Sequence, residues 1–285
     1  MRRIIPLFLS VLFFSNLFAI QKITNSKTNI EEPVIELVSS TIDKSVVKLT
    51  FGSFDLDEVK TKRGNASILK VEGATPLLIS EAPDLLKFTS SIIIPDKSEM
   101  GVKVIFSKYQ DFENVEIAPS KGDFTRDIDP ASMPYIYGQQ YNENEFFPGN
   151  VADLRDPFVL RDYRASTIVF YPFQYNPVTK LLRVYYEIVV EVEEIAENGK
   201  NQLLSENEKK PSSYEHTNIY QNLFLNYNSV KYTPVSENGN MLIISYGQYI
   251  SAMQAFVDWK ISAGRNVEIV DVATIGTASA ISTFR

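Results

Sequence analysis

The chain of 285 residues carries 28 Lys and Arg against 35 Asp and Glu, which gives a net charge of −7 at pH 7. An acidic chain without a basic stretch is a poor partner for nucleic acid or for an anionic membrane surface, so both are excluded. There is no cysteine, which excludes a thiolate nucleophile and a cysteine metal ligand, and His216 is the one histidine. At this length, hydrophobic cores can form without disulfides.

Residues 1–19 have the parts of a secretion signal. Arg2 and Arg3 give a positive end, residues 4–14 an apolar core, and Ser15–Ala19 a polar-to-small exit with Ala19 as the expected last residue removed. The apolar run is shorter than the roughly 20 residues that a transmembrane helix needs. We therefore expect export and removal of the signal, without stable membrane insertion.

Residues 20–195 predict a β-sandwich domain, because short runs rich in Val, Ile and Thr alternate with polar turns. The clearest pair of strands is Ser166–Tyr175 and Leu182–Ile195. The second strand alternates an apolar face with a charged one, which is typical of an antiparallel sheet. Its apolar face contains Val184, Tyr186, Ile188, Val190 and Val192. Pro172 in the first strand predicts an edge position or a bulge.

Residues 117–164 are irregular and dense in Pro, Gly, Asp and Asn, but also in Tyr and Phe. Aromatic residues at this density must pack somewhere, so the segment is loop-like without being disordered. A long ordered loop in a compact domain is unusual enough to indicate a function.

Residues 196–231 predict a linker followed by a docking helix. The first part, up to Thr217, is charged and has no strand period, so we expect it to be flexible. His216 lies there, and we interpret it as a solvated surface histidine because a general base needs a partner held in a cleft. The remainder regains helical spacing. Its apolar positions are Tyr220, Leu223, Phe224 and Tyr227.

Residues 232–285 predict the beginning of a parallel α/β domain. Met241–Ser245 is a short apolar strand, a helical period follows it to a left-handed cap at Gly264, and Val267–Val272 is a second strand. Strand, helix and strand with short connections form a βαβ unit. The chain stops at Arg285, so most strands of such a sheet are missing and the α/β domain is incomplete.

Several motifs in a fixed order give this chain a family resemblance. They include IAPSKGDFTRDIDP, FFPGN, RDYR, YPFQYNPVTK (Tyr171–Lys180) and FVDWK (Phe256–Lys260) followed by Gly264. From about Thr28 to Arg285 the chain resembles the precursors of gingipain-like cysteine peptidases of the Bacteroidetes lineage. The resemblance implies a mainly β chain, with a β-sandwich prodomain that acts as an intramolecular chaperone and inhibitor, before a caspase-like α/β peptidase domain.

The resemblance also implies a route and a processing site. Such precursors are exported to the periplasm and then reach the cell surface or the medium through the type IX secretion machinery. They are usually cut behind a basic residue where the mature enzyme starts, and Lys231 followed by Tyr232 matches that position. The catalytic Cys and His of the family lie later in the peptidase domain, and nothing here corresponds to them. We therefore assign no catalytic residue and expect a chain that is inactive alone, as a truncated precursor or a fragment.

A prodomain can inhibit a peptidase by presenting a substrate-like segment that is not released. Members of the family often prefer Arg or Lys before the cut, and a guanidinium can pair bidentately with a carboxylate in the specificity pocket. Arg126 is our candidate for this plug, between the turn-forming Gly122 and Pro130. The alternative is a surface arginine paired with a neighbouring aspartate. Its rivals are Lys121, Arg155 and Arg161, and its possible ion-pair partners are Asp127 and Asp129.

Other functions account for less of the chain. The acids Glu187, Glu191 and Glu193 share one strand face and suggest calcium, but without converging oxygen ligands they indicate a charged surface. We expect no metal and no cofactor. An exported β-sandwich binding or adhesion module without a link to proteolysis explains residues 32–195 equally well, because a fold does not fix a function. It does not explain the βαβ unit. The cognate peptidase domain is the partner that we expect.

Overall fold

The computed structural model describes residues 20–24, 32–41, 43–204, 214–229 and 241–276, and the chain divides into two units, 1–204 and 205–285. Each unit is described by itself. The strands of the first unit are β1 (Ile20–Thr24), β2 (Val34–Ser40), β3 (Lys44–Thr50), β4 (Ser53–Thr61), β5 (Gly64–Lys70), β6 (Thr75–Pro76), β7 (Leu86–Ile93), β8 (Glu99–Phe112), β9 (Ala152–Leu154), β10 (Phe158–Leu160), β11 (Tyr163–Phe170), β12 (Phe173–Asn176) and β13 (Leu181–Ala196). Two short 3-10 helices, η1 (Pro130–Ser132) and η2 (Gln139–Asn142), lie between β8 and β9.

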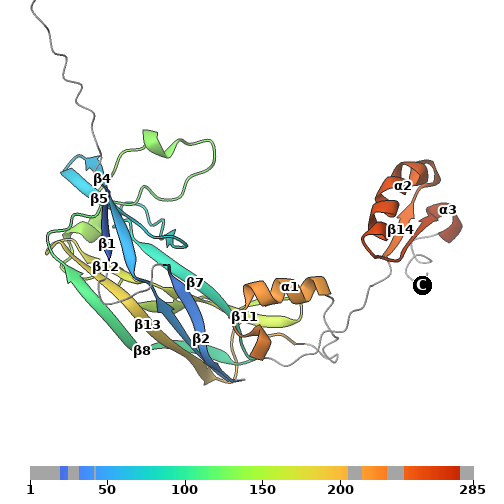
Figure 1. Ribbon diagram of the computed structural model, residues 1–285, viewed down its shortest axis with the longest axis horizontal. Coiled ribbons are helices and arrows are strands. Elements are labelled where there is room, and N and C mark those ends of the chain that lie inside the picture. Colours follow the sequence, from blue (N-terminus) through green and yellow to red (C-terminus); the bar gives the residue numbers. More distant parts are fainter. Residues whose placement is uncertain (1–19, 25–31, 42, 205–213, 230–240, 277–285) are drawn as a thin grey trace, which may run out of the picture. The chain divides into compact units, whose positions relative to one another are not determined.

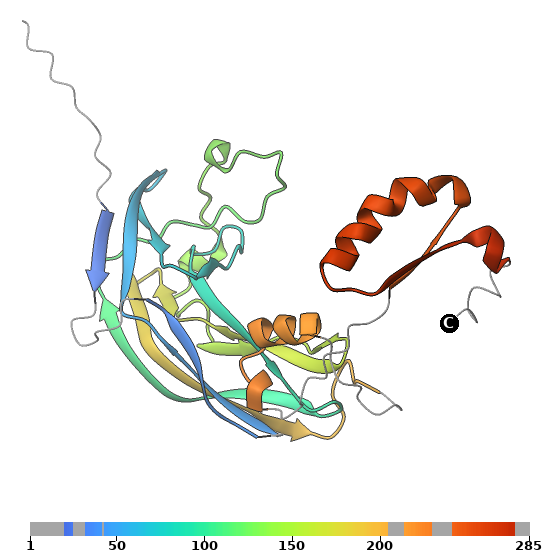
Figure 2. The same cartoon turned by 45° about the vertical axis from the view of Figure 1, so that its right-hand side comes forward.

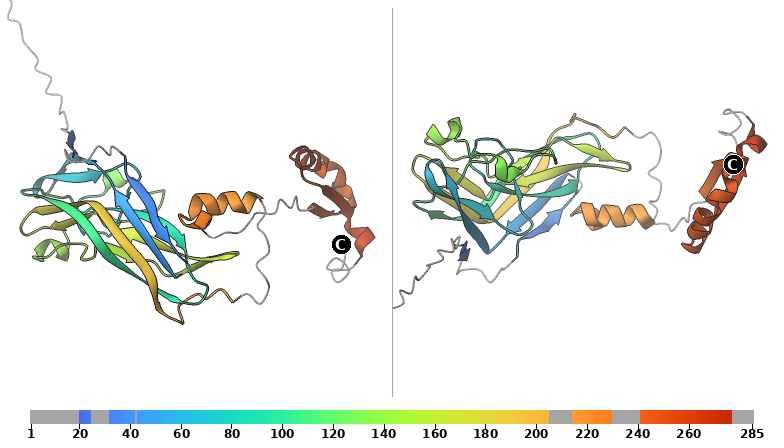
Figure 3. Two further views of the ribbon diagram at one scale, coloured as in Figure 1. Left: turned by 60° about the horizontal axis from the view of Figure 1, so that its bottom comes forward. Right: turned by 90° about the horizontal axis from the view of Figure 1, so that it is seen from above.

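Two five-stranded sheets make up most of the first unit (Figures 1 and 3). One has the order β12-β13-β3-β2, with β8 paired to the other edge of β13; the second has the order β10-β11-β7-β6, with β9 paired to β11. A smaller sheet has the order β1-β4-β5. The pairings within these sheets are antiparallel. The prediction of a mainly β, antiparallel fold is therefore confirmed.

The hydrophobic core lies between the two large sheets and is formed by side chains of both. The ring of Phe51 lies 5.9 Å from that of Phe88 in β7, 5.6 Å from Phe173 in β12 and 5.3 Å from Tyr186 in β13. Along β13 the predicted apolar face is buried, with its valines and Ile188 fully inaccessible. Alternation with a period of two therefore identified the inner face correctly.

The predicted strand Ser166–Tyr175 was wrong in one respect, because it is two strands in different sheets. β11 ends at Phe170 and pairs with β7, whereas β12 begins at Phe173 and pairs with β13. Pro172 lies at the corner between them and is neither at an edge nor in a bulge. Because proline has no N–H to donate, the ladder breaks there; its carbonyl oxygen still accepts from the Tyr185 N–H at 2.8 Å.

Residues 199–203, which we call the latch, are tied to the first unit rather than free. The Gly199 N–H donates to the Lys97 oxygen at 2.7 Å, and the Leu203 N–H to the Asp96 oxygen at 2.8 Å. Beneath them, the guanidinium of Arg164 is fully buried. The first unit thus extends to Leu204, past the predicted boundary at 195, and the predicted flexible linker is wrong for the latch.

The second unit contains α1 (Tyr214–Leu223), η3 (Tyr227–Ser229), β14 (Met241–Ser245), α2 (Gly247–Ser262), β15 (Val267–Asp271) and α3 (Val272–Ile275). β14 and β15 are parallel neighbours, as the βαβ prediction requires. Gly264 ends α2 with φ of 83°, a conformation that glycine adopts without steric cost. His216 lies in α1, half-buried with its ring 6.2 Å from that of Tyr220, so the loop setting expected for it is wrong.

The helix predicted to begin at residue 218 begins earlier, because α1 starts at Tyr214. Tyr220, Phe224 and Tyr227 are buried and their rings contact one another, whereas Leu223, predicted on the same face, is 40% exposed. Among the helices in the described ranges, none has the length and apolar content of a membrane-spanning segment.

Candidate functional site

Residues 121–137 form a loop that stands away from the sheets, and we call it the hoop. Figure 2 shows it in green, leaving and rejoining the small sheet region at neighbouring points. The segment that leads into the hoop ends at Ser120, and we call it the outgoing leg. The segment that leads back from the hoop begins at Gly138, and we call it the return leg. The sequence indicated a long ordered loop with a function over residues 117–164, and the hoop is the part of that segment that projects.

The outgoing leg is built into the sheet before it leaves. The Ser67 N–H donates to the Glu116 oxygen at 2.7 Å, and the Ala118 N–H donates back to the Ser67 oxygen at 2.9 Å. Ile117 and Ala118 are fully buried. On the other side the Ser120 N–H donates to the Ala82 oxygen at 2.7 Å. Because backbone donors and acceptors are paired on both sides, the start of the hoop is fixed.

One residue, Glu81, joins the two legs. Its N–H donates to the oxygen of Ser120, and its oxygen accepts from the N–H of Gly138, both at 2.9 Å. Glu81 adopts a φ of 67°, which is uncommon for a residue with a side chain. A Cβ at Gly138 would lie 2.8 Å from the Glu81 Cβ, so only glycine allows this approach.

The return leg is anchored by Tyr141, which lies in η2 and is 5% exposed. Its hydroxyl donates to the Ile117 oxygen at 2.8 Å, so the return leg is bonded to the outgoing one. Burial raises the pKa of this hydroxyl well above its ordinary value. The phenol therefore stays protonated and remains a donor over the physiological pH range.

The hoop also has internal order. Lys121 Nζ donates to the Pro130 oxygen at 2.8 Å and lies 4.4 Å from the ring centroid of Tyr135. Asp129 caps η1, because its carboxylate accepts from the Ala131 N–H at 2.9 Å, and the Pro130 that follows has no N–H to satisfy. These contacts brace the hoop across its width.

Arg126 lies at a turn within the hoop. The Ile128 N–H donates to the Thr125 oxygen at 3.1 Å, so Arg126 and Asp127 are the two central residues of the turn. Arg126 is exposed, and within the described ranges it forms no ion pair with either neighbouring aspartate. Hydrogen bonds from the Thr125 hydroxyl and its own backbone lower the pKa of the Asp127 carboxyl. The alternative was a surface arginine paired with a neighbouring aspartate. Arg126 does lie at the surface, but in the described ranges that ion pair is not formed.

Of the rival basic residues, Lys121 and Arg161 are engaged in other contacts, and Arg155 lies outside the hoop. Lys121 braces the hoop from inside, as described above. Arg161 lies in a turn with a φ of 52° and pairs with Asp162 at 3.5 Å. Arg155 is exposed beside β9, outside the hoop, and its backbone N–H donates to the Thr167 oxygen at 2.9 Å. Of the four candidates, Arg126 alone combines an exposed side chain with a place on the hoop.

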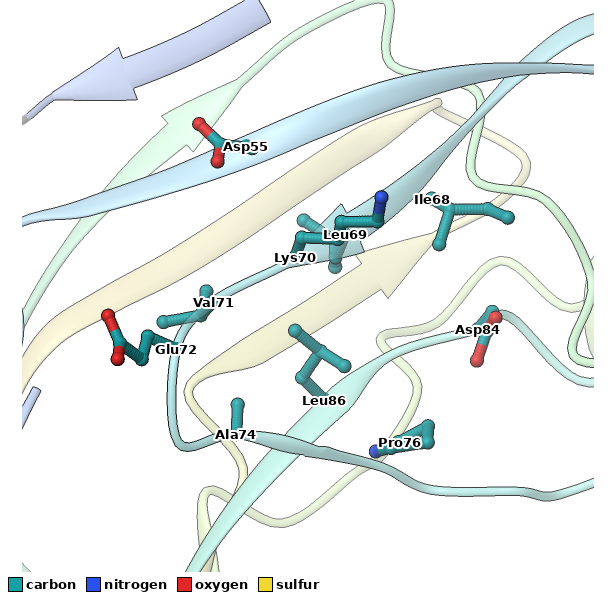
Figure 4. A pocket seen from close by; sticks show the side chains of 10 residues that line it. All are labelled: Asp55, Ile68, Leu69, Lys70, Val71, Glu72, Ala74, Pro76, Asp84 and Leu86. Atoms are coloured by element: carbon teal, nitrogen blue, oxygen red, sulfur yellow. The ribbon is translucent and has the colours of Figure 1, made fainter. Parts of the chain in front are cut away.

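A pocket of about 480 Å³ lies between β5 and β7 (Figure 4). Apolar side chains such as Ile68, Leu69 and Leu86 line it, and Asp84 lies at its margin. The Asp84 N–H donates to the Ala118 oxygen of the outgoing leg at 2.9 Å. Burial raises the pKa of the Asp84 carboxyl, and its charge in turn contributes to the raised pKa of Tyr135 in the hoop. Sequence patterns did not single out this carboxylate.

The acidic face of β13 is neutralised by lysines. Glu187 pairs with Lys108 at 2.6 Å, and Glu191 with Lys44 and Lys103 at 2.6 and 2.7 Å. Glu193 also pairs with Lys103, at 2.6 Å. These carboxylates are therefore occupied by cross-strand ion pairs, as the prediction of a charged surface implies.

Three predicted site residues, Ala19, Lys231 and Tyr232, lie outside the described residues.

The fold and the hoop together define an antiparallel β-sandwich that presents an exposed arginine on a braced loop. Residues 25–224 match the protein family Propeptide_C25. The chain belongs to this family and is a gingipain-type propeptide over these residues.

The chain is similar to curated proteins of Porphyromonas gingivalis. It is 41% identical to Gingipain R1 over 259 residues, which is 88% of this chain and 26% of that protein. It is 37% identical to Gingipain R2 over 280 residues, which is 96% of this chain and 38% of that protein. The chain thus spans well under half the length of these relatives.

Two solved structures are similar in fold. The complex of the Porphyromonas gingivalis RgpB pro- and mature domains matches with a TM-score of 0.63 and 38% identity, over 68% of this chain and 97% of that chain. A structure concerned with the zymogenic latency of gingipain K matches with a TM-score of 0.53 and 19% identity, over 62% of this chain and all of that chain. The second likeness concerns the fold alone.

Proposed function

We propose that this chain is the N-terminal part of a secreted gingipain-like cysteine endopeptidase precursor. Its propeptide assists folding of the peptidase domain and holds it inactive until the propeptide is cut away. The family assignment and the identity with the gingipains R support this proposal. Without cysteine the 285 residues of this chain supply no catalytic thiolate, so they contribute the propeptide and not the catalytic dyad of the precursor. Its partner is the cognate catalytic domain of the same precursor.

The route and the processing site belong to the same proposal. The signal ending at Ala19 directs export to the periplasm, and the type IX machinery then carries the precursor to the cell surface or beyond. Cleavage after Lys231 leaves Tyr232 as the new N-terminus. Lys231 is a basic residue in a polar stretch of the sequence, and proteolysis concentrates in such stretches. Edman sequencing of the secreted mature protein should begin at Tyr232. A different first residue would remove Lys231 as the processing site.

Arg126 is proposed to block the peptidase. The observation that carries this step is an exposed guanidinium, without an ion pair among the described residues, at a turn of a loop whose two legs are bonded to the domain. A peptidase that accepts arginine before the cut offers a carboxylate in its specificity pocket, and guanidinium and carboxylate pair bidentately there. The braced hoop resists the rearrangement that productive cleavage and release require. This is binding like a substrate without turnover.

The test is inhibition of a gingipain R peptidase by this chain added in trans. Arg126→Ala should weaken inhibition about 30- to 1000-fold, the range for a central arginine anchor worth about 2–4 kcal/mol. Arg126→Lys should fall between, because an ammonium keeps the charge but not the bidentate geometry. Arg155→Ala is the matched control and should inhibit as the parent does. Equal inhibition by Arg126→Ala and the parent would show that the plug is elsewhere.

A further inference from the structure

The return leg of the hoop meets a second element, the turn between β4 and β5. The guanidinium carbon of Arg63, in this turn, lies 4.0 Å from the ring centroid of Tyr137 and 5.8 Å from that of Tyr141. The two rings are themselves 4.6 Å apart at 71°, edge to face. Tyr137 is the last residue of the hoop, and Tyr141 is its buried anchor. Arg63 therefore lies over the aromatic pair through which the hoop joins the domain.

The same turn holds Tyr137 by its polar end. The Tyr137 hydroxyl and Thr61 Oγ1 are 2.9 Å apart, and Thr61 Oγ1 also accepts from the Arg63 N–H at 3.2 Å. The turn is tight, because Gly64 has a φ of 114° and Thr61 Oγ1 lies 2.9 Å from its oxygen. These bonds and the pairing of Thr61 with Gly64 hold the turn closed, so it can support the neighbouring hoop.

Arg63 has no evident task inside its own hairpin. It is exposed, and among the described residues it forms no ion pair. A cation over an aromatic face is attracted by the ring quadrupole, and a planar guanidinium stacks well on it. The neighbouring Lys62 is equally exposed and contacts neither ring in the described part of the chain. The contact with the hoop thus belongs to Arg63 and not to basic residues of the turn in general.

We propose that Arg63 is a positioning residue for the inhibitory hoop: it clips the return leg to the β4–β5 turn and so holds Arg126 ready to enter the peptidase. This rests on the proposed function of Arg126. The Glu81 bonds fix where the hoop begins and ends, and Thr61 holds the Tyr137 hydroxyl, whereas Arg63 holds the face of the Tyr137 ring. A loop that is ordered before binding loses less conformational freedom on binding, so it binds more tightly. The clip supplies this order without touching the peptidase.

The experiment is a double-mutant cycle on the full chain, with inhibition of a gingipain R peptidase as the readout. Arg63→Ala should weaken inhibition about two- to fivefold, as expected for an exposed cation–aromatic contact. In the Arg126→Ala background the same change should have no effect, because a positioning residue acts only through the group it positions. Lys62→Ala is the matched control and should inhibit as the parent does. Arg63→Lys should recover part of the loss.

Amide exchange separates the two proposals. Arg63→Ala should speed exchange at the Gly138 N–H, which is bonded to Glu81, while the melting temperature stays that of the parent. An Arg63→Ala chain that inhibits as well as the parent overturns the clip but leaves Arg126 in place. An equal loss in both backgrounds means that Arg63 touches the peptidase, which also overturns positioning. If Arg126→Ala inhibits the peptidase as well as the parent does, the proposed function of Arg126 fails. In that case the amide exchange still tests the clip, because an unchanged exchange rate at the Gly138 N–H in Arg63→Ala overturns it.

Discussion

The latch and the base of the hoop each shield a charged side chain from water, fully at Arg164 and partly at Asp84, and they treat the charge in opposite ways. At the latch, Arg164 donates to the oxygens of Pro95, Ser98, Lys200 and Asn201 at 2.5–3.0 Å. At the hoop, the carboxylate of Asp84 forms no hydrogen bond or ion pair among the described residues. The fully buried guanidinium of Arg164 is satisfied by four carbonyls, whereas the half-buried carboxylate of Asp84 is only desolvated.

The difference follows from what each region has to do. The latch closes the sandwich where the chain leaves it, and a guanidinium with its fixed fork of donors can join several carbonyls that have no ladder partner. The hoop base must instead bring two legs together through backbone bonds, and Asp84 contributes its N–H to that purpose. The position of the Asp84 side chain therefore follows from this backbone bond and not from a contact of its carboxylate. A functional region that tolerates such a cost is common in proteins.

The largest effect is expected at the latch. Arg164→Met keeps much of the volume but leaves four backbone oxygens without their donor, and unsatisfied buried groups are costly. We expect the free energy of unfolding to fall by about 3–5 kcal/mol, measured by urea denaturation. Arg161→Ala, in the neighbouring exposed turn, should change it by less than about 0.5 kcal/mol. A stable Arg164→Met chain would mean that the carbonyls find other donors and that the latch is not what holds this end.

The same contrast explains which features the sequence predicted. The period of two along β13 and the position of Gly264 follow from local geometry, so the inner face and the helix end were predictable. The corner at Pro172 and the latch depend on which strands pair across the fold, which no local pattern contains. Arg126 was found through its family motif and its turn residues. That it forms no ion pair among the described residues depends on the other partners of Asp127 and Asp129, which are the Thr125 hydroxyl and backbone N–H groups.

The supports of the hoop were missed for the same reason. Glu81, Arg63 and Tyr137 are far apart in the sequence and carry no shared spacing. The roles of Arg63 and Tyr137 come from the β4–β5 hairpin, which was itself not predicted because charged residues interrupt its apolar positions. Glu81 acts only through its backbone, so its residue type gave no signal. The aromatic density of residues 117–164 was the one usable indication, and Tyr137 and Tyr141 belong to it.

The smallest effect is expected at Asp84, and it tests the other side of the comparison. Burial raises the pKa of its carboxyl above the ordinary 3.8, so the folded state binds this proton more tightly than the unfolded state. The corresponding stability is present below pH 3.8 and is lost as the pH rises through the higher folded pKa. Asp84→Asn has no such loss. At pH 7 the variant should therefore be more stable than the parent.

Unfolding measured at several pH values isolates this contribution, because the other carboxylates titrate alike in both chains. The advantage of Asp84→Asn over the parent should be largest near pH 7 and should shrink toward pH 3.5, as the parent carboxyl takes up its proton. Glu72→Gln, at an exposed position of the same pocket, is the matched control and should show no such trend. An advantage that stays constant with pH would mean that the ionised Asp84 carries no desolvation cost. The two regions would then differ in their hydrogen bonding but not in the free-energy cost of desolvating a charged side chain.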